Sequence, residues 1–227
     1  MTDVRAMRRR NAVSAFGMGA VFVGLYLLAV RTRWGQAADA WMNDLLHNLI
    51  VYPYDRWLGE LARDLGPVLS AVVVVPLAVG AALGRRWRSL VAATMIAAVP
   101  VAAWLLRRSG PDRPELGVVL PHVNTYPSTH AAIVASACAA AAFLWRRPGH
   151  PAVIMVLGLT AVLGALGNVL SHAHLPSDVL GSLLMTGAAA AFAAAVTGAS
   201  PLSCVGRAGL PEQGRTGGEV SGAHGGS

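Results

Sequence analysis

Two histidines and an aspartate stand together in the stretch SHAHLPSD, residues 171–178, between two long apolar runs. Ionisable groups at such a place in an apolar chain are costly and usually mark function. Asp178 follows His174 by four residues, so its carboxylate can accept a hydrogen bond from one ring nitrogen and leave the other free as a nucleophile. We therefore expect a catalytic pair here, with His172 as a solvated neighbour at a helix end.

A second cluster, YPSTH at residues 126–130, has the composition of a helix start. Ser128 suits the N-cap position, and the free backbone N–H groups at a helix N-terminus form an anion site. His130 then falls in the first turn of the helix, beside any bound anion, where it can transfer a proton.

A third cluster, RRSGPDRPEL at residues 107–116, supplies arginines. Arg113, together with Arg107 or Arg108, offers guanidinium groups whose geometry suits phosphate oxygens. Combined with the other two clusters, these residues predict a phosphoryl-transfer site that needs no metal and no cofactor.

The remainder of the chain has the composition of an integral membrane protein. Of its 227 residues 55% are hydrophobic and 13% are charged, whereas a soluble domain carries about 25% charged residues. The 18 basic residues, all arginine, give a formal charge of +7. No basic cluster is interleaved with the aromatic residues that a nucleic-acid groove requires, so nucleic acid is not an expected partner.

Six apolar stretches close to the ~20 residues of a membrane-spanning helix predict an all-α protein with six spans. They cover residues 12–30, 67–84, 89–106, 129–145, 152–171 and 177–197. The first apolar run is longer than a signal-peptide core, so we expect a retained anchor.

Arginine placement orients this layout. Eleven of the 18 arginines fall on one side of the spans, within residues 5–10, 85–88, 146–147 and 207–215. The positive-inside rule then places both termini in the cytoplasm and the three polar clusters on the outer face of the cell membrane.

The segments outside the spans are expected to differ in structure. Residues 1–11 form a cytoplasmic N-terminus, and residues 31–66 an interfacial helical region. The Gly- and Ser-rich residues 198–227 are expected to be a disordered cytoplasmic tail. Three further histidines are expected to be surface or loop residues, namely His47, His122 and His150.

The three polar clusters resemble the motifs of the type 2 phosphatidic acid phosphatases, membrane lipid phosphatases related to the vanadium haloperoxidases. The family pattern is Lys, six residues and Arg-Pro; then Pro-Ser-Gly-His; then Ser-Arg, five residues, His, three residues and Asp. Arg113-Pro114 matches the end of the first motif. Pro127 to His130 matches the second, with Thr129 in place of glycine, and His174 and Asp178 match the end of the third. The resemblance covers residues 100–185 and implies a lipid phosphate phosphatase-like bundle.

The resemblance also implies a role for each matching residue. His174 would attack phosphorus and carry the phosphoryl group, Asp178 would orient it, and His130 would protonate the leaving alkoxide. The phosphate oxygens would be held by Arg113, Ser128 and the Thr129 backbone. The substrate would be a lipid phosphate of the phosphatidate, phosphatidylglycerol phosphate or undecaprenyl diphosphate type.

Two positions depart from the family pattern. The family lysine falls at Leu106, so its role would pass to Arg107 or Arg108. The family arginine falls at Asn168, and Gly167 replaces the serine before it. Losing a comparable transition-state donor costs about 3–4 kcal/mol, or roughly 10² to 10³ in rate.

Two alternatives stay open on the sequence. Asn168 favours a catalytically inactive relative that binds lipid phosphate. The other alternative is a metal-dependent membrane hydrolase or a metal transporter. The side chains that bind zinc and related ions are present in His130, His172, His174 and Asp178.

Overall fold

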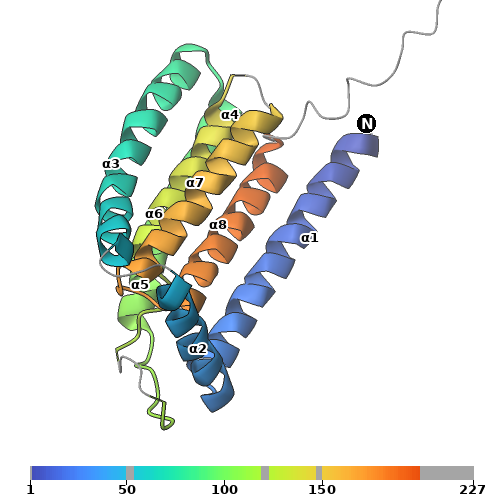
Figure 1. Ribbon diagram of the computed structural model, residues 1–227. Helices are drawn as coiled ribbons and strands as arrows, with labels where there is room; N and C mark the ends of the chain where they lie inside the picture. The colour runs from blue at the N-terminus through green and yellow to red at the C-terminus, as the bar shows by residue number, and fades with distance from the viewer. Residues whose placement is uncertain (1, 50–53, 119–122, 147–149, 200–227) are drawn as a thin grey trace, which may run out of the picture.

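Every regular element of the computed structural model is a helix, over the residues that the structure describes, 2–49, 54–118, 123–146 and 150–199 (Figure 1). The elements are α1 (Thr2–Leu25), the π-helix η1 (Tyr26–Val30), α2 (Arg33–Leu49), α3 (Tyr54–Leu83), α4 (Trp87–Ala97), α5 (Val99–Ser109), α6 (Thr129–Leu144), α7 (Pro151–Leu170) and α8 (Pro176–Thr197). The all-α prediction is confirmed for this part of the chain. His122, Cys204 and the predicted tail from residue 200 onward lie outside the described residues.

Five segments are long and apolar enough to cross a membrane, namely Val4–Val30, Trp57–Leu83, Trp87–Ser109, Pro151–Leu170 and Pro176–Thr197. Many of their large apolar side chains are exposed, for example Phe16, Val72 and Met155. A large exposed apolar surface marks a membrane contact. The chain therefore has the character of an integral membrane protein.

The sixth predicted span, residues 129–145, corresponds to α6, an apolar helix of 16 residues. At 1.5 Å per residue it is about 24 Å long, shorter than the ~30 Å hydrocarbon core. Six spans are thus not confirmed by helix length. α6 instead occupies the centre of the bundle, where it packs against α3, α4, α5, α7 and α8. Its many alanines allow these neighbours to approach closely.

Helix boundaries differ from the predicted spans at three places. α1 begins at Thr2, so the predicted N-terminal segment is helical from there. α3 begins at Tyr54 and not near residue 67, because neither its charged residues nor Pro67 ends the helix. The third span is divided into α4 and α5 at Ala98, where the missing N–H of Pro100 removes a helical hydrogen bond.

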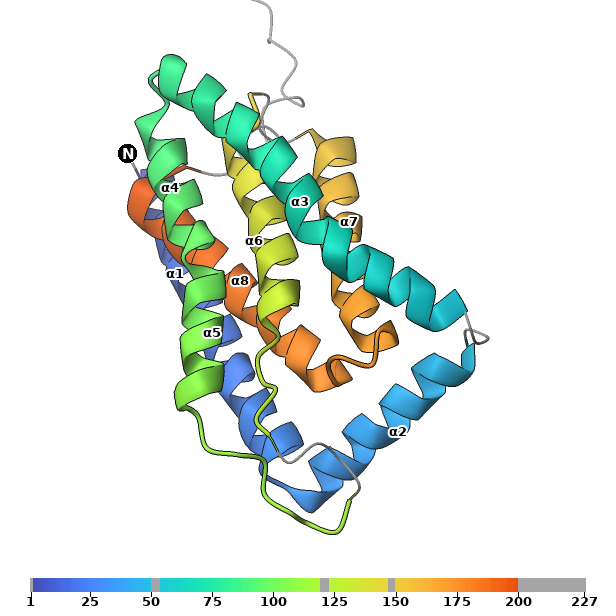
Figure 2. The same ribbon diagram turned by 90° about the vertical axis from the view of Figure 1, so that its left-hand side faces the viewer.

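α2 lies across the end of the bundle at which α3 and α6 begin and α5 and α7 end (Figures 1 and 2). It contacts η1, α7 and α8. An interfacial helix was the prediction for this region, and α2 places it directly beside the polar residues that the sequence singled out.

Candidate functional site

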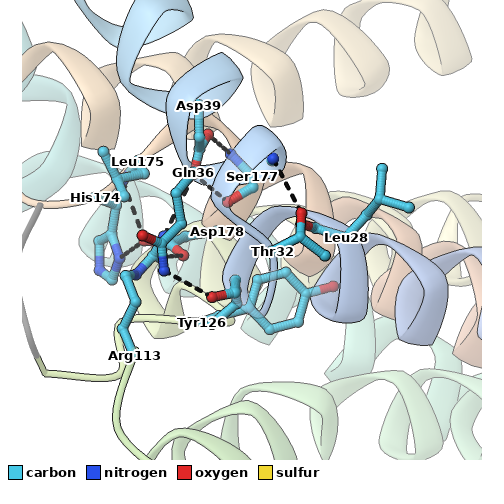
Figure 3. Close-up of polar contacts among 12 residues, drawn as sticks. Leu28, Thr32, Gln36, Asp39, Arg113, Tyr126, His174, Leu175, Ser177 and Asp178 are labelled. Atoms are coloured by element: carbon cyan, nitrogen blue, oxygen red, sulfur yellow. Dashed lines mark hydrogen bonds and ion pairs between the residues drawn. The ribbon is translucent and has the colours of Figure 1, made fainter. Parts of the chain in front are cut away.

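Asp178 is the centre of a buried polar cluster at the start of α8 (Figure 3). One carboxylate oxygen, Oδ1, lies 3.4 Å from Arg113 Nη2. The other, Oδ2, accepts a hydrogen bond from the Leu175 backbone N–H at 3.1 Å and lies 3.4 Å from His174 Nδ1. A carboxylate in the first helical turn is further stabilised by the helix dipole. Asp178 therefore ties together two of the three clusters predicted from the sequence.

His174 is held by the loop that joins α7 to α8. Its backbone N–H donates to the Asn168 carbonyl at 3.2 Å, and its side chain is buried against Asp178. With the ring proton on Nδ1, His174 donates to the carboxylate and leaves Nε2 unprotonated, a tautomer inferred from this contact. The predicted orienting contact between Asp178 and His174 is thus present.

Arg113 is buried, with 4% of its surface exposed, although it lies in the segment between α5 and α6. The buried side chain of Gln36 fixes this segment by donating from Nε2 to the carbonyls of Val30, at 3.0 Å, and Pro114, at 2.9 Å. Arg113 Nε and Nη1 have no hydrogen-bond partner among the residues described. Buried donors of this kind are costly to leave unpaired, so they suit an anionic ligand.

Asp39 belongs to the same cluster and was missed by the sequence analysis. It extends from α2 to the first turn of α8, where Oδ1 accepts from the Ser177 backbone N–H at 2.9 Å and Oδ2 from the Ser177 hydroxyl at 2.6 Å. Arg113 Nη1 lies 3.8 Å from the same Oδ2. Burial raises the pKa of Asp39 above its usual value, while the hydrogen bonds from Ser177 act in the opposite direction. Asp39 lies one helical turn from Gln36, so both side chains are on the same face of α2. This pair of polar residues is the only feature of the sequence that could have indicated a role for Asp39.

The start of α6 lies beside this cluster. Ser128 is the N-cap, as predicted, since its Oγ accepts from the Ala131 N–H at 3.3 Å. Its backbone N–H donates to the Asp178 carbonyl at 3.1 Å, and its own carbonyl accepts from Ser182 Oγ at 2.7 Å. These bonds fix the first turn of α6 against the first turn of α8. The hydroxyl of Thr129 and the Nδ1 of His130 are buried without a hydrogen-bond partner in the described structure.

Tyr126 sets the position of the segment that enters α6. Its hydroxyl donates to the Phe22 carbonyl at 2.7 Å, so the ring bridges α1 and the bundle. A Cβ at Gly181 of α8 would stand 2.5 Å from the ring, which explains why only glycine fits there. The cluster YPSTH is thus held from α1, α6 and α8 at once.

The side chains of three residues that were predicted to bind phosphate lie outside the Asp178 cluster. Arg107 and Arg108 end α5 with exposed side chains, and the Arg108 guanidinium lies 5.3 Å from the centre of the Trp104 ring. Asn168 is fully buried, but its Nδ2 donates to the Gly164 carbonyl of its own helix at 2.8 Å. None of the three therefore donates to the Asp178 cluster.

His47, expected to be a surface residue, is half-buried. Its ring is stacked on that of His172, with 3.9 Å between centroids. The contact joins the end of α2 to the loop that carries His174. Elsewhere, His150 is exposed at the start of α7, and Cys138 is a buried free thiol.

An apolar cavity of about 770 Å³ lies between α3, α6 and α7. It is lined along α3 from Leu58 to Val74 and along α7 from Ala152 to Gly164. At a helical rise of about 1.5 Å per residue, the stretch of α3 that lines the cavity gives it a length of about 24 Å. Ala62 in this lining packs against Gly167, the neighbour of Asn168, since a Cβ on Gly167 would stand 2.6 Å from Ala62 Cβ.

Within the described ranges, no group of three or more His, Cys, Asp or Glu side chains is arranged to hold a metal ion. Compared with protein-family models, with curated proteins and with solved structures, the chain matches none.

Proposed function

We propose that this protein is an integral-membrane phosphatase that removes phosphate from a lipid phosphomonoester or diphosphate through a phosphohistidine intermediate. The observation that carries the proposal is the buried contact series from Arg113 to Asp178 to His174, beside the N-terminus of α6. A nucleophile, its orienting carboxylate and phosphate-binding donors are the parts that such a reaction requires.

In the first step, His174 Nε2 attacks phosphorus while Asp178 Oδ2 holds the proton on Nδ1. The bond between phosphorus and the lipid oxygen breaks, its electron pair stays on that oxygen, and protonated His130 supplies the proton. In the second step, water attacks phosphorus, His130 takes the water proton, and the phosphorus–nitrogen bond returns its electron pair to His174. The contact of 3.4 Å between His174 and Asp178 is long, as hydrogen bonds in ligand-free sites often are.

The donors for the phosphate oxygens come from two places. Arg113 presents Nε and Nη1 without hydrogen-bond partners, and α6 presents the free N–H groups of its first turn. These donors stabilise negative charge as it develops in the transition state, which is usually the largest single contribution to catalysis.

The apolar cavity supports a lipid as the substrate. Ala62 in its lining packs against Gly167, the neighbour of Asn168, and the lining is almost entirely apolar, with hydroxyls only from Ser70 and Thr160. Its length of about 24 Å suits one hydrocarbon chain lying along the helices. We assign the cavity to a chain of the substrate, whose phosphate then reaches His174.

The topology belongs to the same proposal. α6 would be the sixth span; a short helix suffices because its neighbours, and not lipid, surround it. Both termini would face the cytoplasm of a cell membrane, and the site would open to the outer leaflet, in accordance with the arginine distribution.

The proposal is tested by phosphate release from the full-length protein in detergent with EDTA present. Phosphatidate and undecaprenyl diphosphate are offered to the wild type, to His174→Ala and to His150→Ala as an exposed control. We expect release from the wild type and the control and none from His174→Ala. Equal release from His174→Ala, or release abolished by EDTA, would contradict the mechanism.

A second candidate function is binding of lipid phosphate without turnover. It is favoured by Asn168, whose amide hydrogen bonds within its own helix and donates no charge to the site. In the same experiment, a folded wild type that binds phosphatidate but releases no phosphate would support this candidate.

A further inference from the structure

Arg63 of α3 lies beside the candidate site, although neither the sequence motifs nor the proposed mechanism uses it. α3 and α6 both begin at the end of the bundle that carries the site (Figure 2). On α3, Gly66 packs against Val134 of α6, since a Cβ there would stand 2.8 Å from Cγ2 of the valine. One helical turn back along both helices, Arg63 on α3 comes beside His130 on α6.

The face of α3 that carries Arg63 is the one that contacts α7. Gly59, one turn before Arg63, packs directly against the Ser171 backbone nitrogen at the end of α7, so closely that a Cβ would not fit. Ala62 meets Gly167 on the same face. Arg63 is therefore half-buried between the first turn of α6 and the end of α7, near position 168.

One donor of the Arg63 guanidinium is unsatisfied in the described structure. Its Nε is buried and has no hydrogen-bond partner among the residues that the structure describes. Arg63 is one of the charged groups near His130, together with Arg107 and Asp64.

Arg113 is opposed by two buried carboxylates, Asp39 and Asp178, so these three groups together carry one net negative charge. With the proton that the proposed mechanism places on His130, the charges of the site only cancel. A cation at Arg63 gives the site a net positive charge toward a phosphate dianion, on the side where Asn168 supplies none.

We propose that Arg63 binds the substrate phosphate and supplies, from α3, the guanidinium that position 168 lacks. The inference rests on the proposed function for its ligand, a phosphate group. Because Arg63 is next to Ala62, which lines the apolar cavity, one helix would contact both the phosphate and the hydrocarbon chain of the lipid.

The test measures binding of inorganic phosphate to the full-length protein in detergent by calorimetry, at low ionic strength. We expect Arg63→Gln to weaken phosphate binding by roughly tenfold to a hundredfold, as expected for loss of a charged hydrogen bond. Arg63→Lys keeps the charge but not the planar fork, so a smaller loss is expected. Arg33→Gln, an exposed arginine at the start of α2, is the matched control and should bind as the wild type does.

Moving the positive charge from position 63 to position 168 provides a second test. If Arg63 had only a structural role, this change would not restore phosphate affinity. In the background of Arg63→Gln, the substitution Asn168→Arg should restore part of the lost phosphate affinity. If Arg63→Gln folds poorly, the phosphate affinity of Arg63→Lys is compared with that of the double variant Arg63→Lys, Asn168→Arg.

The outcomes separate this inference from the proposed function. Phosphate binding unchanged in Arg63→Gln and Arg63→Lys, or no phosphate binding by the wild type, would overturn the inference. Turnover that depends on His174 would then still support the phosphatase. Conversely, weakened phosphate binding in Arg63→Gln, in a protein that shows no turnover, would support Arg63 as a phosphate ligand and contradict catalysis.

Discussion

His130 carries the proton transfers of the proposed reaction. Its ring lies in the first turn of α6, near His174 and Arg63, and its Nδ1 has no hydrogen-bond partner in the described structure. An alkoxide leaving from a lipid is strongly basic and needs a proton as the phosphorus–oxygen bond breaks.

Replacing His130 by alanine should therefore affect substrates unequally. We expect His130→Ala to lower kcat for a lipid alkyl phosphate by roughly 10² to 10⁴, the usual contribution of a general acid or base. Formation of the phosphohistidine from p-nitrophenyl phosphate should fall much less, because its leaving group needs no proton. Rapid-quench kinetics measure both, and an equal loss for the two substrates would argue against an acid role.

Residues that act through near neighbours were predictable from the sequence. The contact between His174 and Asp178 and the N-cap at Ser128 each join residues no more than four positions apart. Asp39 and Arg63 were not predictable, because their contacts depend on how α2 and α3 pack against α6 and α8. No local pattern encodes a partner 138 residues away, as Ser177 is from Asp39.

At the scale of elements, α2 is fastened to α8 through Asp39. The carboxylate satisfies the Ser177 N–H and hydroxyl and stands beside Arg113 in a buried setting. Removing one partner of a buried polar group leaves the others unsatisfied.

We therefore expect Asp39→Ala to destabilise the fold by about 3–5 kcal/mol. Asp44→Ala, at an exposed position of the same helix, should have little effect. Thermal unfolding in detergent provides the comparison. Equal melting temperatures for Asp39→Ala and the wild type would mean that this contact does not hold α2 in place.

The cavity between α3, α6 and α7 permits a test at the same scale. A phenylalanine at Ala137, which lines the cavity, should exclude part of a lipid chain. Because each buried methylene contributes about 0.8 kcal/mol, loss of two raises KM for a long-chain lipid phosphate roughly tenfold. A short-chain water-soluble analogue should be unaffected, as should Leu159→Phe, which lies outside the cavity. An unchanged KM for the long-chain lipid would place its chain elsewhere.

Helix boundaries show where apolar periodicity is an incomplete guide. Apolar runs located all five of the described segments that are long and apolar enough to cross a membrane. They placed the start of the second span too late, since Glu60, Arg63 and Asp64 were assigned to the interfacial helical region before it. They located α6 to within one residue but also counted it among the spans, because a helix enclosed by other helices and one enclosed by lipid are equally apolar.

At the scale of the whole molecule, the proposed orientation follows from the arginines alone. Single cysteines can test it in a background that lacks Cys138 and Cys204. We expect a membrane-impermeant maleimide to label Asp112→Cys on intact cells and Arg146→Cys only after permeabilisation; both positions are exposed. The reverse pattern would place the candidate site in the cytoplasm.

The central claim is that His174 carries the phosphoryl group, and trapping that intermediate tests it most directly. The full-length protein is mixed with ³²P-labelled phosphatidate, quenched in alkali within milliseconds, and analysed by peptide mass spectrometry. We expect an acid-labile, alkali-stable label on His174 that is absent from His174→Ala and Asp178→Ala. Turnover without any label, or a label on another residue, would contradict it.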